Sequence, residues 1–161
     1  MPSFDVVSKV PWVEVDNALN QTKKELAQRY DFKDTNTSIE KTEEGIVIVA
    51  NSEGRVEAAL DVLQGKFVKR GVSLKHIDPQ KVLPAGGNTQ RQLLKIREGI
   101  DKDNARKIID AIKASKIRVQ PAIHDDTVRV SGKNRDDLQD VIRALRGGDF
   151  PVELQFVNFR E

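Results

Sequence analysis

The chain has 161 residues, of which 38% are hydrophobic, 5% aromatic and 32% charged. Its 27 basic and 25 acidic residues leave a net charge of only +2, so any electrostatic function must come from how the charges are distributed. The absence of cysteine excludes disulfides and thiolate chemistry. We find neither an apolar run of signal-peptide length at the start nor a membrane span of about 18 apolar residues, and we expect a cytoplasmic protein.

The first half of the chain alternates short β-rich runs with two helical stripes. The predicted strands cover residues 4–10, 38–42, 46–50 and 72–77. A weak helical stripe begins at Val15, and a stronger one runs from Val56 to Phe67 with Ser52 as its N-cap. These stripes predict amphipathic helices whose apolar faces form a core.

The second half repeats this order. Its predicted strands cover residues 92–100, 117–123, 127–131 and 152–159. The helical stripes run from Ala105 to Ile112 and from Leu138 to Leu145, and Asp101 or Asp103 is suited to cap the first of them.

Each half therefore has the order β-α-β-β-α-β, which is typical of the ferredoxin-like arrangement. The sequence predicts an α+β protein with two such domains in tandem, each a four-stranded antiparallel sheet with two helices on one face. The predicted domains cover 1–79 and 90–161, and the Pro- and Gly-containing stretch 80–89 is the predicted linker. The pattern leaves open an exchange of a terminal or linker-adjacent strand between the halves.

Alternation along the strands of the second half predicts a basic open sheet face. Its predicted members are Lys95, Arg97, Arg118 and Arg129, with Gln120 and Gln155 nearby. Arginine side chains match phosphate oxygens bidentately, so Arg97, Arg118 and Arg129 are expected to bind phosphates while the glutamines contact a base or ribose. Lys133 and Arg135 add cations where a helix dipole does not favour them. The pattern fits equally well a solvated face whose basic residues prevent edge association.

The search for catalytic groups finds no metal or acid–base cluster. His76 and His124 lie in different halves without ligand neighbours, and both are interpreted as surface or turn residues. The glycine-rich stretch 84–88 lacks the Gly-Lys-Ser/Thr ending of a phosphate-binding loop. We expect no enzymatic activity, no cofactor and no metal.

Four ordered motifs resemble the YajQ family of small bacterial proteins. The motifs are Pro2–Ser8, Arg29–Lys33, Arg97–Asp101 and Leu154–Arg160. The resemblance implies tandem domains with ribonucleoprotein-motif topology in a bacterial cytoplasm. It also implies binding of RNA or of nucleotides such as GTP or, for some members, cyclic-di-GMP, without known enzymatic activity.

The motif Arg29–Lys33 supplies weaker candidates for the site. Arg29, Tyr30, Phe32 and Lys33 lie near the first hairpin, where an aromatic ring can stack a base, although packing against the sheet is the favoured interpretation. Family members usually carry glycine after this segment, whereas here Asp34 follows. The alternative function is a protein-interaction adaptor of a transcription or replication complex, and the oligomeric state is not predicted.

Overall fold

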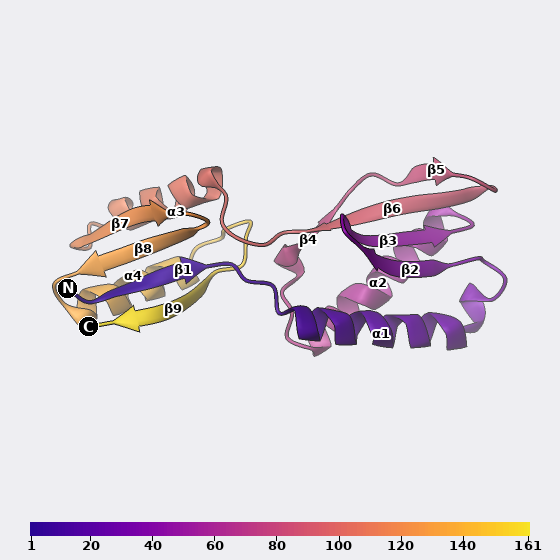
Figure 1. Cartoon of the computed structure of the whole chain (residues 1–161), viewed down its shortest axis with the longest axis horizontal. Helices are drawn as coiled ribbons and strands as arrows, with labels where there is room; N and C mark the ends of the chain where they lie inside the picture. Colours follow the sequence, from indigo (N-terminus) through magenta and orange to yellow (C-terminus); the bar gives the residue numbers. More distant parts are fainter. The chain divides into compact units, whose positions relative to one another are not determined.

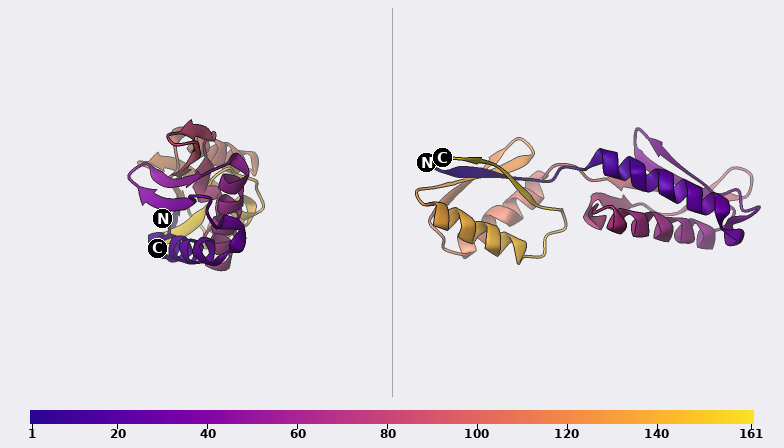
Figure 2. Two further views of the ribbon diagram at one scale, coloured as in Figure 1. Left: turned by 90° about the vertical axis from the view of Figure 1, so that its right-hand side faces the viewer. Right: turned by 90° about the horizontal axis from the view of Figure 1, so that it is seen from below.

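The structure is a computed structural model that describes all residues from Met1 to Glu161, and its chain divides into two compact units. Residues 1–9 and 98–161 form one unit, called here the terminal unit, and residues 10–97 form the central unit. Both are α+β, and each carries two helices on one face of an antiparallel sheet (Figures 1 and 2). The predicted fold class, a tandem of ferredoxin-like domains, is confirmed.

The terminal unit places its N-terminal strand in the middle of its sheet. Its elements are β1 (Ser3–Val7), α3 (Lys102–Ala114), β7 (Val119–His124), β8 (Thr127–Gly132), α4 (Arg135–Arg146) and β9 (Gln155–Arg160). The strand order is β7-β8-β1-β9. Fully buried Phe4 and Val6 of β1 face α3 and α4, and Val130 and Val128 lie opposite them on β8. Each such buried side chain contributes roughly 1.5–3 kcal/mol to folding.

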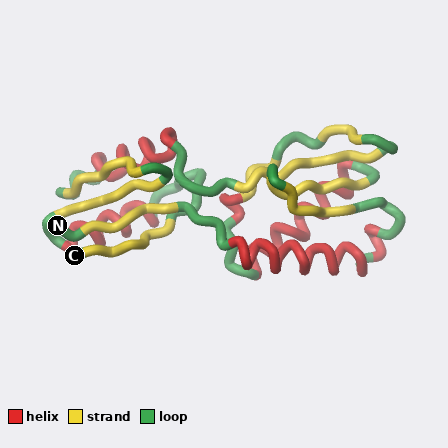
Figure 3. The backbone as a smooth tube through the Cα atoms, viewed as in Figure 1, coloured by secondary structure: helices red, strands yellow, loops and turns green.

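The central unit has the same architecture with its middle strand supplied late in the chain. Its elements are α1 (Trp12–Gln28), β2 (Ser38–Thr42), β3 (Gly45–Ala50), α2 (Glu53–Lys69), β4 (Ile77–Pro79), β5 (Leu83–Ala85) and β6 (Thr89–Ile96). The sheet order is β2-β3-β6-β4, and β5 also pairs with β6. Both helices of this unit lie on one face of its sheet (Figure 3). Ile46, Ile48 and Leu94 belong to the core that the helices and the sheet share.

The strand pairing therefore exchanges two strands between the halves of the sequence. β1 pairs with β8 and β9, and β6 pairs with β3 and β4. The physical reason for this pairing is the polarity of the side chains on the sheet faces that no helix covers. Asp5 on β1 lies opposite Arg129, whereas Leu93 on β6 lies opposite Val47. The central unit's β3 would offer Asp5 only apolar neighbours, and an unpaired buried carboxylate is costly.

The stretch predicted to be a linker belongs to the central sheet. β5 and the start of β6 lie within residues 80–89, and Leu83, Pro84 and Ala85 pair with Arg91, Gln90 and Thr89. The structure also differs from the prediction of a strand over residues 72–77. A short 3-10 helix covers Leu74–His76, because the Ser73 hydroxyl accepts a hydrogen bond from the Lys75 amide and turns the chain before β4.

Two predicted helix caps are confirmed. The Ser52 hydroxyl accepts a hydrogen bond from the Arg55 amide at 3.2 Å, and the Asp101 carboxylate accepts one from the Asn104 amide at 2.8 Å. Across these four helices, none combines the length and the apolar character that crossing a bilayer requires.

Candidate functional site

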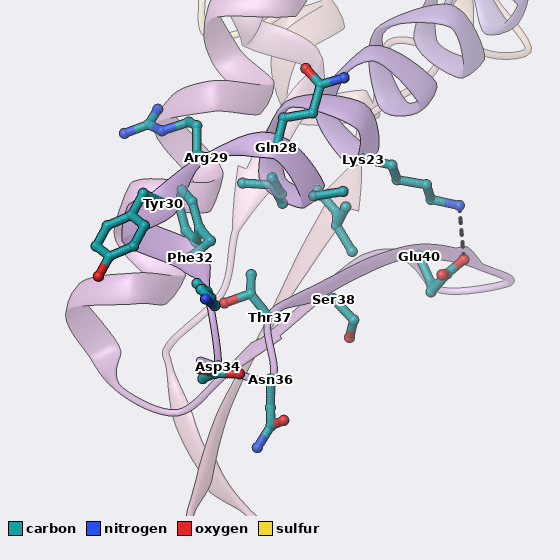
Figure 4. A pocket seen from close by; sticks show the side chains of 14 residues that line it. Lys23, Gln28, Arg29, Tyr30, Phe32, Asp34, Asn36, Thr37, Ser38 and Glu40 are labelled. Atoms are coloured by element: carbon teal, nitrogen blue, oxygen red, sulfur yellow. Dashed lines mark hydrogen bonds and ion pairs between the residues drawn. The ribbon is translucent and has the colours of Figure 1, made fainter.

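A pocket lies in the central unit, where α1 ends and the chain turns into β2 (Figure 4). Its volume is about 690 Å³, within the range typical of small-molecule sites. Residues from the end of α1, the turn and β2 line it. They are Lys23, Leu26, Ala27, Gln28, Arg29, Tyr30, Phe32, Lys33, Asp34, Asn36, Thr37, Ser38, Ile39 and Glu40. This cavity is called the Tyr30 pocket below.

The turn that shapes the pocket is anchored by a buried phenylalanine. A short 3-10 helix spans Tyr30–Phe32, in which the Lys33 amide donates to the Tyr30 carbonyl at 3.0 Å. Phe32 is only 5% exposed and belongs to the core, as the sequence favoured. The Thr35 hydroxyl donates to the Phe32 carbonyl at 2.7 Å, and the Asn51 amide donates to the Thr35 carbonyl at 2.9 Å. The pocket floor is therefore fixed to the sheet.

Tyr30 differs from its neighbour, and the expectation that it packs against the sheet was wrong. The side chain is 87% exposed, and it projects from the turn to the same side as Arg29 (Figure 4). The Lys33 ammonium lies 6.0 Å from the centre of the Tyr30 ring. Since successive residues of a tight turn point in different directions, Phe32 fills the core and Tyr30 is left in solvent. An exposed aromatic ring with a cation beside it is suited to stack a base.

Arg29 is held by acidic groups rather than left open for a ligand. It binds Asp31 through two hydrogen bonds of 3.0 and 2.7 Å and Glu25 at 3.2 Å, and it lies over the Phe32 ring. Hydrogen bonds from Arg29 lower the pKa of Asp31. The pKa of Glu25 is lowered mainly by a hydrogen bond from Lys66 and to a smaller extent by one from Arg29. Arg29 therefore stiffens the turn. Lys33 forms no ion pair and remains the available cation beside Tyr30.

Asp34 has a left-handed backbone conformation. Its φ is 59° and that of Asn36 is 53°, both in the left-handed region that favours glycine and tolerates aspartate and asparagine. A glycine would suit this position for the same geometric reason. Asp34 holds the turn at a conformational cost.

The predicted basic face of the second half is dispersed by the strand exchange. Lys95 lies on β6 of the central unit opposite Asp78, and Arg97 forms an ion pair with Asp78 at 3.2 Å, so placing these two on the second sheet was wrong. Gln155 bonds with the backbone of Lys9, and Arg135 pairs with Glu161.

Three other predicted residues do come together. Arg118, Gln120 and Lys133 line a smaller pocket of about 340 Å³ in the terminal unit, together with Met1, Asn134 and Asp137. Arg129 lies on the open face of that unit's sheet and pairs with Asp5. The nucleotide-binding role of these residues stays a prediction.

Sequence reasoning missed both the wall of the Tyr30 pocket and the partners of Arg129. Gln28, Asn36, Thr37 and Ser38 supply polar groups to the pocket, and the polar run after Lys33 was the available signal. His76 was interpreted as a surface residue, but its ring is buried and bonds to the Arg97 carbonyl at 3.0 Å.

Comparison with known proteins places the whole chain in one group. The family described as "Nucleotide-binding protein YajQ-like" matches residues 2–160. The chain belongs to the YajQ-like family. It is 56% identical over 162 residues to a protein named "Nucleotide-binding protein" from Anaeromyxobacter dehalogenans (strain 2CP-C), with all of both chains covered. A protein of the same name from Trichlorobacter lovleyi is 50% identical over 161 residues, again with complete coverage. The resemblance seen in the four sequence motifs is confirmed.

Proposed function

We propose that this protein binds a nucleotide in the Tyr30 pocket, with a base stacked on Tyr30 and a phosphate close to Lys33. The observation that carries the proposal is the 87% exposure of Tyr30 at the mouth of a pocket of about 690 Å³. A ring so exposed contributes little to folding, whereas stacking of one base on an aromatic side chain is worth about 1–3 kcal/mol. The family description and the names of the relatives support a nucleotide as the ligand.

The chemistry of the pocket favours a guanine nucleotide, such as cyclic-di-GMP or GTP, or a short stretch of RNA. Amides of Gln28 and Asn36 offer both donors and acceptors to a base edge, and the hydroxyls of Thr37 and Ser38 offer the same to a ribose. The ligand's phosphate would meet one unpaired cation, Lys33. We propose binding without chemical turnover.

Calorimetric titration of the wild-type protein with cyclic-di-GMP, GTP and an eight-nucleotide RNA tests the proposal. Tyr30→Ala should weaken binding roughly 5- to 150-fold, which corresponds to the loss of one stacked base. Tyr30→Phe is the matched control, because it keeps the ring and should retain affinity. Equal affinity of the wild type and Tyr30→Ala for every ligand would refute the Tyr30 pocket as the site.

The same titrations separate the ligands from one another and from the adaptor alternative. RNA binding should weaken with salt, with a log–log slope of about −0.7 for each phosphate contacted. A cyclic dinucleotide with few phosphate contacts should show a shallower dependence. Absence of binding to all three ligands would favour the protein-interaction adaptor.

A further inference from the structure

A second charged site lies on the open face of the terminal unit's sheet, in residues that the Tyr30 pocket does not use. The register places Asp5 of β1 opposite Arg129 of β8, and Ser3 of β1 opposite Arg160 of β9. Phe4 and Val6 point to the helices, so Asp5 and its partners lie on the face that the helices leave uncovered.

Asp5 is a buried carboxylate whose acceptor capacity is filled. It is 4% exposed and accepts hydrogen bonds from Arg129 Nε at 3.1 Å, from Asn158 Nδ2 at 2.9 Å and from Arg160 Nη1 and Nη2 at 3.3 and 2.9 Å. Burial by itself raises the pKa of Asp5, but the bonds from Arg160, Asn158 and Arg129 outweigh it and hold that pKa well below the ordinary value. The carboxylate therefore stays ionised and shielded from any anionic ligand.

The two arginines carry more charge than Asp5 balances. One carboxylate neutralises one guanidinium, and the alternation of the strands brings no other acidic residue to this face. The side chains of Arg129 and Arg160 are 41% and 42% exposed. Arg129 uses only Nε, so both of its terminal amino groups remain without a protein partner. That pair of groups is the fork that binds two oxygens of one phosphate.

We propose that Arg129 and Arg160 form a phosphate-binding site for the backbone of single-stranded RNA, and that Asp5 is the residue that positions them. Polar groups continue along the same face, with Gln120 and Ser131 on one side of the arginine pair and Gln155 on another strand. Such a row suits an extended strand better than an isolated ion. The ring of buried Phe4 contacts those of Phe156 and Phe159, and Phe4 faces the helices. The strand positions paired with Asp5 and Arg129 carry no aromatic residue, so this face reads the backbone with little sequence preference.

Arg129→Lys separates a binding role from a structural one. Lysine keeps the positive charge and one donor for Asp5, but it loses the outward-facing fork. Fluorescence anisotropy with a labelled ten-nucleotide oligouridylate should show at least a fivefold loss of affinity, while the thermal unfolding midpoint stays near that of the parent. Arg143→Lys is the matched control, since Arg143 lies on α4, is 72% exposed and pairs only with Asp140. Unchanged affinity in Arg129→Lys would overturn the proposal.

Asp5→Asn tests positioning against simple charge. If the arginines act as unorganised positive charge, removing the carboxylate should strengthen RNA binding; if Asp5 orients them, binding should weaken. Stronger binding therefore overturns the positioning role. If Asp5→Asn does not fold, Arg129→Lys combined with Arg160→Lys tests the site itself, with a further loss of affinity expected and wild-type affinity overturning the site.

All of these measurements use protein carrying Tyr30→Ala, so that the Tyr30 pocket does not contribute and either proposal can fail alone. Oligouridylates of two, four and ten nucleotides and inorganic phosphate distinguish a strand from a free anion. Affinity should rise with length and fall with salt at about −0.7 per phosphate contacted. Equal affinity for inorganic phosphate and the ten-nucleotide strand would overturn the assignment to RNA.

Discussion

Asp5 and Arg129, 124 positions apart in the sequence, lie opposite each other on adjacent strands, with Arg129 Nε 3.1 Å from Asp5 Oδ1. This pair joins the N-terminal strand to the sheet of the terminal unit. Because Asp5 is buried and Arg129 is partly exposed, the carboxylate depends on its partners more than they depend on it.

Asp5 makes the stability of the protein sensitive to acid. Its folded-state pKa lies below the value of about 3.9 expected in the unfolded chain, so its contribution is complete above pH 4 and is lost as the pH falls through the folded-state value. Asp5→Asn should lower the free energy of unfolding at pH 7 by roughly 2 kcal/mol and flatten its decrease between pH 5 and 2. Urea unfolding across this pH range measures both effects.

The control for this experiment is Asp103→Asn, whose carboxylate is exposed and lies 3.8 Å from Arg106. It should leave stability nearly unchanged. The pKa values of Glu14, Glu25 and Asp31 are also lowered, by Arg70, Lys66 and Arg29 respectively, so some acid sensitivity should persist in Asp5→Asn. An acid limb identical to that of the wild type would contradict the assignment to Asp5.

The strand exchange predicts which fragments fold. Residues 10–97 contain every strand of the central sheet and should fold alone, whereas residues 98–161 lack β1, the shared partner of β8 and β9. Joining residues 98–161 through a short glycine-serine linker to residues 1–9 should restore the fold, because Ser3 and Arg160 are paired neighbours. Circular dichroism and thermal unfolding measure this. Cooperative unfolding of 98–161 alone would contradict the observed pairing.

Gly45 begins β3 in a conformation that excludes a side chain. Its φ is 146°, and an added Cβ would overlap the Leu94 carbonyl oxygen on β6. Gly45→Ala should therefore destabilise the central unit by at least about 2 kcal/mol. The matched change Gly65→Ala in α2 meets open space and should stabilise by about 0.5–1 kcal/mol. Chemical denaturation of the two variants should give shifts of opposite sign.

Asp34 offers a stabilising change beside the Tyr30 pocket. Replacing this residue, whose φ is 59°, with glycine removes the conformational cost of a side chain in the left-handed region. The gain is reduced by the greater freedom of glycine in the unfolded chain, so Asp34→Gly should raise the free energy of unfolding by less than about 1 kcal/mol. A clear loss of stability would show that the Asp34 side chain itself supports the turn.

The sequence predicted the helices and most strands because their signals are local. Val56, Ala59, Leu63 and Phe67 of the predicted stripe are buried, whereas Leu60 is only partly buried. The alternation of Val128, Arg129 and Val130 sorts core from open face as predicted. The motif Arg29–Lys33 was recognised, but both of its aromatic residues, Tyr30 and Phe32, were expected to pack against the sheet. Only the turn geometry separates buried Phe32 from exposed Tyr30.

By itself, the sequence determined the fold class, the family and, where strand pairing is regular, the face on which a strand residue lies. Only the tertiary structure decided which sheet each strand joins. β1 and β6 both alternate apolar and polar residues, so either fits the middle of a ferredoxin-like sheet by pattern alone. The choice depends on contacts distant in sequence, where Asp5 requires Arg129 and Arg160 while Leu93 packs opposite Val47. That choice moved Lys95 and Arg97 away from the predicted basic face and left Arg129 and Arg160 to form it.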